Sequence, residues 1–176
     1  MAIKTERLLL RQWKESDFEP FAAINADPEV MAFYPSIQST EQSHEMAKLF
    51  QGLIEQKGWG FWAVERLSDQ AFIGFVGLHE PRYDLPVTPC VEIGWRLSKD
   101  AWGKGYATEA AKAALDFAFN ELNLKQVYSF TTVSNMRSRS VMEKIGMNNT
   151  QENFEHPIIP EGHSLREHVL YKISRS

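Results

Sequence analysis

The sequence is poor in cysteine: Cys90 is the only one among 176 residues. A single cysteine excludes an internal disulfide and a zinc cluster built on several cysteines. The chain also lacks an apolar signal core near its start, and no apolar run approaches the roughly 20 residues of a membrane-spanning helix. These absences predict a cytoplasmic protein with no membrane partner.

An excess of positive charge is missing as well. The 19 Lys and Arg residues are outnumbered by 23 Asp and Glu residues, for a formal net charge of −4. Because nucleic-acid binding rests on many cationic contacts to phosphate, this balance disfavours a direct nucleic-acid partner. The apolar fraction of 43% is ordinary for a globular protein, and the length fits one domain over residues 1–176. The histidines show no convincing metal-ligand spacing, so we expect no metal.

The order of predicted elements indicates a mixed α/β fold. Helices are expected from two capping boxes, at 16–19 and 39–42, from a short restart at Asp27, and over 103–122 and 136–145. Strands are expected at 8–13, 59–67, 72–80, 91–97, 126–133, around 154 and at 169–173. Segment 81–90, rich in proline, is expected as a loop. The unit 91–133 must place its two strands parallel, whereas the strands before it form an antiparallel run.

The segment 102–110 reads Trp-Gly-Lys-Gly-Tyr-Ala-Thr-Glu-Ala, between a strand and an alanine-rich helix. Gly103 and Gly105 permit a turn with positive φ, and the helix that follows presents unpaired N–H groups at its N-terminus. Such a turn favours a phosphate-bearing ligand. A Walker loop is absent, and a dinucleotide fingerprint is weak because Thr108 stands at its sixth position. Glu109 would repel a phosphate that it faced, so we expect it to point away as a structural group.

A series of short motifs resembles the GNAT superfamily of N-acetyltransferases, in its ribosomal-protein N-terminal acetyltransferase (RimJ/RimL-like) branch. The resemblance covers nearly the whole chain, and each motif is weak alone but specific in this order and spacing. The family's phosphate signature usually begins with Gln or Arg, where this chain has Asp100. The matching segments are 5–11, 62–65, 73–77, 92–97, 102–110, 135–138 and 143–146.

The resemblance implies acetyl-CoA as co-substrate without a metal. It also implies a mostly antiparallel sheet of about seven strands, helices on both faces, and a splayed parallel pair that receives the pantetheine arm. Asn135 would hold that arm, although its residue type also suits a helix cap. Arg137 and Arg139 are expected mainly on a solvated face. The expected cofactor-binding residues are Trp95, Arg96, Leu97, Trp102, Gly103, Lys104, Gly105, Tyr106, Ala107, Asn135 and Ser138.

Acetyl transfer to an amine requires a base, a donor to the thioester oxygen and a proton for the leaving thiolate. Glu92 is the first candidate for the base, with His79 near it on the neighbouring strand. A main-chain N–H near Trp95 or Arg96 is the candidate donor. Much of the superfamily protonates the thiolate with a tyrosine. Here that position appears as Met142, and Ser138 is the substitute that the branch suggests.

The acceptor site is expected among aromatic residues, with Phe33, Tyr34 and Trp59 as the substrate-binding candidates. An α-amine of pKa ~8 costs about 1.4 kcal/mol to neutralise at pH 7, against about 4.6 for a lysine-type amine. We therefore expect an acetyl-CoA-dependent N-acetyltransferase whose leading acceptor is a protein N-terminal α-amine, of the ribosomal-protein type. Two alternatives stay open: acetylation of a small amine (polyamine, amino acid or antibiotic), and a non-catalytic CoA-binding module. The protein is expected as a monomer or homodimer.

Overall fold

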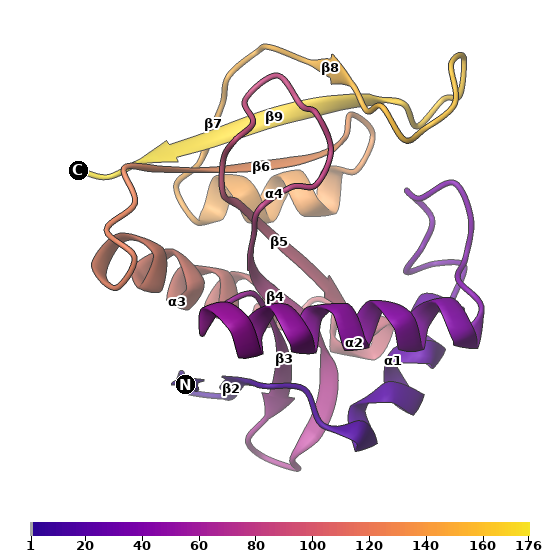
Figure 1. The fold of residues 1–176 in the computed structure, drawn as a ribbon, viewed down its shortest axis with the longest axis vertical. Coiled ribbons are helices and arrows are strands. Elements are labelled where there is room, and N and C mark those ends of the chain that lie inside the picture. The colour runs from indigo at the N-terminus through magenta and orange to yellow at the C-terminus, as the bar shows by residue number, and fades with distance from the viewer. Residues whose placement is uncertain (1) are drawn as a thin grey trace.

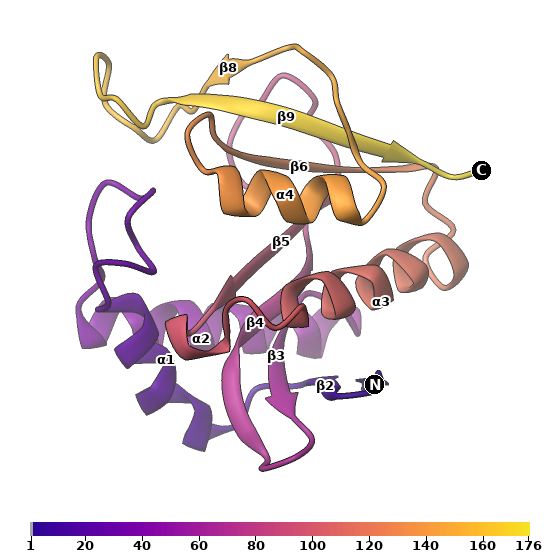
Figure 2. The ribbon, with the colours of Figure 1, turned by 180° about the vertical axis from the view of Figure 1, so that it is seen from behind.

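The computed structural model describes residues 2–176, which form one nine-stranded sheet (Figures 1 and 2). The strand order is β1-β2-β3-β4-β5-β6-β9-β7, and β8 pairs with an earlier stretch of β9 than β7 does. All neighbouring pairs are antiparallel except β5 and β6. The strands are β1 (Ile3–Lys4), β2 (Leu8–Arg11), β3 (Phe61–Arg66), β4 (Ala71–His79), β5 (Glu92–Leu97), β6 (Gln126–Thr132), β7 (Asn148–Asn149), β8 (Phe154–Glu155) and β9 (Glu167–Ser174).

Two helices lie on each face of the sheet, as expected from the sequence. In Figure 1, α1 (Phe18–Asn25) and α2 (Thr40–Lys57) lie in front; Figure 2 shows α3 (Tyr106–Asn120) and α4 (Met136–Lys144) on the opposite face. The predicted capping box of α2 is present: Ser39 Oγ accepts from the Gln42 N–H, and Gln42 accepts from the Ser39 N–H. The helix ends at Gly58, whose φ of 81° is a left-handed conformation that glycine adopts without strain.

The core lies between the sheet and these helices. Its largest fully buried side chains include Trp62, Tyr171 and Phe21. Helix α3 buries a stripe of small residues, each 0% exposed, which lets the helix backbone approach the sheet closely (Ala110, Ala111, Ala114 and Ala118). Close packing of this kind fixes the start of α3, and with it the glycine turn, relative to β5.

The central parallel pair opens into a wedge. Strands β5 and β6 pair only at Glu92 and Tyr128, whereas β6 pairs with β9 at seven positions along its whole length. Beyond Glu92 the edge of β5 therefore has no neighbouring strand on that side. The splay that the family resemblance implied is present, and it exposes main-chain hydrogen-bonding groups in the middle of the sheet.

The structure corrects several local predictions. The capping box expected at 16–19 does not form: a 3₁₀ turn (Glu15–Asp17) precedes α1, and the Asp17 carboxylate instead accepts from the Lys14 N–H and pairs with Arg11. Residues 27–34 form turns rather than a short helix. The short strands β1 and β7 were not predicted, because two-residue strands leave no periodic pattern.

Candidate active site

Two cavities meet at the splay between β5 and β6. The first, of about 370 Å³, lies among β5, the glycine turn and the helices α3 and α4. The second, of about 620 Å³, lies among residues 33–50, the start of loop 81–90, β6 and the segment around 156–159. Five residues line both cavities: Tyr34, Trp95, Arg96, Asn135 and Ser138. A donor in one cavity and an acceptor in the other would therefore meet at this junction.

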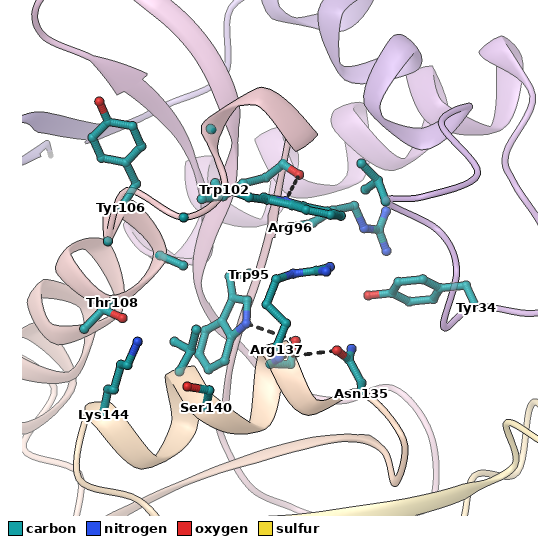
Figure 3. Close-up of a pocket in the computed structure, with 18 residues that line it drawn as sticks. Tyr34, Trp95, Arg96, Trp102, Tyr106, Thr108, Asn135, Arg137, Ser140 and Lys144 are labelled. Carbon is teal, nitrogen blue, oxygen red and sulfur yellow. Dashed lines mark hydrogen bonds between the residues drawn. The ribbon is translucent and has the colours of Figure 1, made fainter.

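The glycine turn forms one wall of the first cavity (Figure 3). Gly103 and Gly105 have φ angles of 73° and 80°, and Gly105 is the N-cap of α3. A side chain would be strained at either position. The first hydrogen bond of α3 joins the Glu109 N–H to the Gly105 carbonyl, so the N–H groups of the preceding turn have no partner within the helix. These groups and the helix dipole suit a phosphate.

All but one of the predicted cofactor-binding residues line this cavity. The exception is Lys104, whose Nζ donates to the Asp100 carbonyl at 2.7 Å and which is exposed on the outer side of the turn. Asp100 itself accepts from the Ser98 hydroxyl at 2.6 Å. In this structure neither side chain reaches the cavity, so binding there depends on main-chain groups of the turn.

Glu109 points away from the cavity, as predicted. Its carboxylate accepts hydrogen bonds from the Thr5 hydroxyl (2.6 Å) and from the N–H and Nε of Arg7 (2.9 and 2.7 Å). Partial burial opposes ionisation, but the hydrogen bonds from Thr5 and Arg7 prevail and lower the pKa of Glu109. The residue therefore ties the start of α3 to the N-terminal strands.

Asn135 has the capping geometry that its residue type suggested. Its Oδ1 accepts from the Ser138 N–H at 3.3 Å, and its Nδ2 donates to Thr131 Oγ1 at 3.0 Å. Each of these groups can form one further hydrogen bond. Ser138 Oγ accepts from the Trp95 indole Nε1 at 3.3 Å, which links α4 to β5 at the junction. The cap therefore leaves capacity for a ligand.

The edge of β5 identifies which main-chain N–H is free. The carbonyls of Val91 and Ile93 point toward β6, since they accept from the Tyr128 N–H (3.0 Å) and the Ser129 hydroxyl (2.9 Å). Because strand groups alternate between edges, the Trp95 N–H points to the same side, where β6 has diverged. The Arg96 main chain faces β4 instead. Two main-chain N–H groups are candidates for the donor to the thioester oxygen. That of Trp95 has no neighbouring strand opposite it, whereas that of Arg96 faces β4.

Glu92 and His79 are direct partners across β5 and β4, so their side chains lie on the same face, in the second cavity. Burial raises the pKa of Glu92 to about 8. Burial, together with the positive charges of Arg82 and Lys57, lowers the pKa of His79 to about 4, and its ring stacks on Phe61 at 4.9 Å. With these pKa values Glu92 is mostly protonated at pH 7 and is the stronger base once ionised, whereas His79 stays neutral.

The predicted acceptor residues are only partly brought together. Phe33 and Tyr34 line the second cavity, and Tyr34 is 42% exposed. Trp59 does not line it: the residue packs against the core, and Lys57 Nζ lies 5.2 Å from its ring centre. Trp59 lies two residues before β3 and outside the residues that line the acceptor cavity, so its role in substrate binding stays a prediction.

Several cavity residues lay outside the sequence predictions. Arg137 was expected on a solvated face. It is exposed, but its guanidinium lies over the Trp102 ring at 3.4 Å, in the wall of the first cavity (Figure 3). His156 and His168 line the second cavity with ring centres 5.0 Å apart. No local pattern marks the two histidines, because their approach follows from the pairing of β8 and β9.

Comparison with known proteins identifies the family. The family profile described as an acetyltransferase (GNAT) domain matches residues 7–148. The chain belongs to the GNAT acetyltransferase family, and is an N-acetyltransferase of that family.

Individual relatives extend the match over most of the chain. An uncharacterized N-acetyltransferase of Bacillus subtilis, YnaD, is 31% identical over 173 residues, covering 98% of this chain and 96% of the relative. The FsC-acetyl coenzyme A-N(2)-transacetylase of Aspergillus fumigatus is 31% identical over 159 residues, covering 86% and 67%. The solved structure of a GNAT-family acetyltransferase from Bacillus anthracis is 29% identical with a TM-score of 0.81, covering 99% of this chain and 98% of that one.

Within residues 2–176, no helix is both long and apolar enough to span a membrane. Across the same residues, no group of three or more His, Cys, Asp or Glu side chains is arranged to hold a metal ion.

Proposed function

We propose that the protein transfers the acetyl group of acetyl-CoA directly to the α-amine of an acceptor. The observation that carries this proposal is the meeting of two cavities at the unpaired edge of β5, beside Trp95. A direct reaction requires both reactants within contact distance. The shared junction provides such a place without a covalent enzyme intermediate.

In this proposal, the main chain of the glycine turn and the first turn of α3 bind the pyrophosphate of acetyl-CoA. The exposed edge of β5 and the side chain of Asn135 bind the amide-bearing arm. Acetyl-CoA, when bound, supplies an activated thioester. The Trp95 N–H then donates to the thioester oxygen as negative charge develops there.

Glu92 is proposed as the general base. A carboxylate with a pKa near 8 can take a proton from an α-amine of similar pKa with little free-energy cost, directly or through one water. A lysine-type amine, of pKa about 10.4, would be harder to deprotonate by roughly 3 kcal/mol. This difference supports an α-amine as acceptor. His79 would assist by shape and hydrogen bonding, since its low pKa makes it a poor proton acceptor at neutral pH.

Ser138 is proposed to donate a hydrogen bond to the leaving thiolate. Its Oγ accepts from the Trp95 indole, so its own O–H can point to a second group. Met142 is 1% exposed in the wall of the second cavity and has no proton to give.

The leading acceptor is a protein N-terminal α-amine, as in the ribosomal-protein branch, because Phe33 and Tyr34 offer an aromatic wall for an N-terminal residue. A small amine is the second candidate. The single cysteine supports a cytoplasmic location, and a monomer or homodimer is proposed.

The test follows free thiol after mixing the purified protein with acetyl-CoA and matched acceptors. The panel holds a peptide with a free N-terminus, the same peptide blocked at that amine but carrying lysine, and spermidine. We expect turnover of the first peptide above the other two. Turnover of spermidine or lysine alone would overturn the α-amine assignment. A thermal shift with acetyl-CoA without turnover of any acceptor would identify a CoA-binding module, and no shift at all would refute the assignment of the donor.

A further inference from the structure

Arg96 is a buried cation without a counter-ion. Its side chain is 9% exposed, yet no carboxylate in residues 2–176 lies within ion-pair distance. Arg11, which is equally buried, pairs with both Asp17 and Glu65 at 2.8 Å. Buried charges in folded proteins are normally paired, because an unpaired one loses its hydration without compensation. Arg96 departs from a rule that Arg11 follows.

The contacts of Arg96 are all neutral. Nη1 donates to Asn25 Oδ1 at 2.8 Å, and the guanidinium lies 4.6 and 5.3 Å from the ring centres of Tyr34 and Phe75. Nε is buried and has no hydrogen-bond partner. The rings and the amide orient the guanidinium and stabilise it in part, but they leave its positive charge unmatched.

The position of this charge indicates which ligand would match it. Arg96 lines both cavities and directly follows Trp95, whose N–H marks the expected place of the thioester. Its side chain lies on the face of β5 that carries Glu92, opposite Phe75 on β4, and contacts α1 through Asn25. The Trp95 side chain, in contrast, contacts Ser138 on α4 and lines the first cavity together with the glycine turn. In Figure 3 the Arg96 guanidinium lies beside Tyr34, far from Tyr106 at the start of α3.

The carboxylates of the second cavity do not neutralise Arg96. Glu45 is exposed on α2. Glu92 lies four residues back along the strand, about 13 Å away between Cα atoms. An anion that enters the junction is therefore the available partner.

We propose that Arg96 binds a carboxylate of the acceptor, close to the amine that is acetylated. This inference rests on the proposed function and narrows its acceptor class. A planar guanidinium matches a carboxylate in shape and charge, and the adjacency of Trp95 and Arg96 holds the amine beside the thioester when the carboxylate is bound. The carboxylate can come from a free amino acid or from an acidic side chain at a peptide N-terminus. A polyamine lacks this group and is repelled by the unpaired cation.

The experiment compares acceptors that differ only in the carboxylate. One pair is the C-terminally amidated peptides Glu-Ala-Ala and Gln-Ala-Ala, and the other is leucine and leucinamide. We expect kcat/KM to be about 10- to 100-fold higher for the acid in at least one pair, the size expected of a charge-assisted hydrogen bond. Leucinamide has the less basic amine, so more of it is deprotonated and able to attack at neutral pH. A preference for leucine could therefore not result from the reactivity of its amine. The pair that shows the preference identifies the source of the carboxylate.

The variant Arg96→Gln should remove this preference, because it should raise KM for the acid far more than KM for the matched neutral acceptor. Arg96→Lys should restore part of it. Arg82→Gln is the matched control, because Arg82 is an exposed arginine of the same cavity, and this variant should keep the preference.

Equal turnover of acid and neutral acceptors by the unmodified enzyme would overturn the inference while leaving the proposed function intact. An equal loss of kcat/KM on both acceptors in Arg96→Gln would also overturn the inference, because it would indicate a purely structural residue. Loss of the preference in Arg82→Gln would overturn it as well. If Arg96→Gln does not fold, the comparison of acceptors with the unmodified enzyme still decides. Failure to acetylate any acceptor would refute the proposed function itself.

Discussion

Replacing Glu92 with glutamine should remove one titration from the pH–rate profile. The carboxyl group is enclosed in the second cavity, and burial raises its pKa to about 8. A base acts only when ionised, so log kcat/KM should rise with pH below 8 and bend near 8. Glutamine keeps the shape of the side chain but cannot ionise. The variant should therefore lose the bend, and its slope below pH 8 should be smaller by one unit.

The size of the effect follows from the ionised fraction of Glu92. With a pKa near 8, roughly one tenth of the carboxyl is ionised at pH 7 and roughly nine tenths at pH 9. Ionisation of Glu92 alone should therefore raise kcat/KM about tenfold between pH 7 and pH 9. Loss of a positioned base should lower the rate by about 10²- to 10⁴-fold at the upper end of this range.

The assay measures thiol release from pH 6 to 9 with two acceptors, an α-amine of pKa about 8 and a lysine-type amine of pKa about 10.4. The bend due to Glu92 should stay at the same pH with both, whereas any bend due to the amine should move with the acceptor. Glu45→Gln is the matched control: Glu45 is an exposed carboxylate of the same cavity, and its variant should keep the bend. An unchanged profile in Glu92→Gln would refute Glu92 as the base.

Further predictions concern stability and the donor cavity. Glu92→Gln should also change stability: the folded-state pKa is raised above the unfolded value near 4.5, so the folded state holds the proton more tightly. Stability should fall as pH rises from 4.5 to 8, by up to roughly 5 kcal/mol, and denaturant unfolding of the variant should lack this fall. Gly103→Ala should raise KM for acetyl-CoA and cost about 1–2 kcal/mol, because φ is 73° although no atom crowds the added Cβ. Gly52→Ala, equally uncrowded but inside α2, should instead stabilise by about 0.5–1 kcal/mol, and equal behaviour of the two would exclude backbone strain as the cause. Glu109→Gln should lower stability by about 1 kcal/mol with KM for acetyl-CoA unchanged; a raised KM would show that the residue shapes the phosphate site.

Local signals in the sequence predicted the parts of the fold that depend on neighbouring residues. The cap at Ser39, the end of α2 at Gly58 and the glycine turn before α3 are each specified within a few residues. The box at 16–19 did not form, and the Asp17 carboxylate pairs instead with Arg11 on β2 and accepts from the Lys14 N–H beside a 3₁₀ turn. Such competition is invisible in a local pattern.

The donor side of the site was more predictable than the acceptor side for the same reason. The glycine turn, Trp95 and the start of α4 are single motifs, and the fold brings them to one cavity. The acceptor cavity is assembled from segments far apart in the sequence, which is why no local pattern shows that Trp59 lies outside its lining and that His156 lies within it. The unpaired state of Arg96 is likewise a property of packing, since an arginine on a strand gives no sign of whether a carboxylate will meet it.

The methionine at position 142 shows how one departure from the family pattern can leave the chemistry intact. The two proton transfers of the reaction differ in difficulty. A thiol has a pKa near 8.5, so a departing thiolate is only mildly basic at pH 7 to 9, whereas an ammonium must lose its proton before it can attack. Assistance to the thiolate is thus the smaller requirement, and a hydroxyl such as Ser138, fixed by the Trp95 indole, can meet it with a single hydrogen bond. The larger requirement falls on the amine, and in our proposal the Glu92 carboxylate meets it, because its raised pKa is close to that of an α-amine. Loss of the tyrosine therefore removes the less demanding part of the mechanism and does not by itself argue for a non-catalytic module.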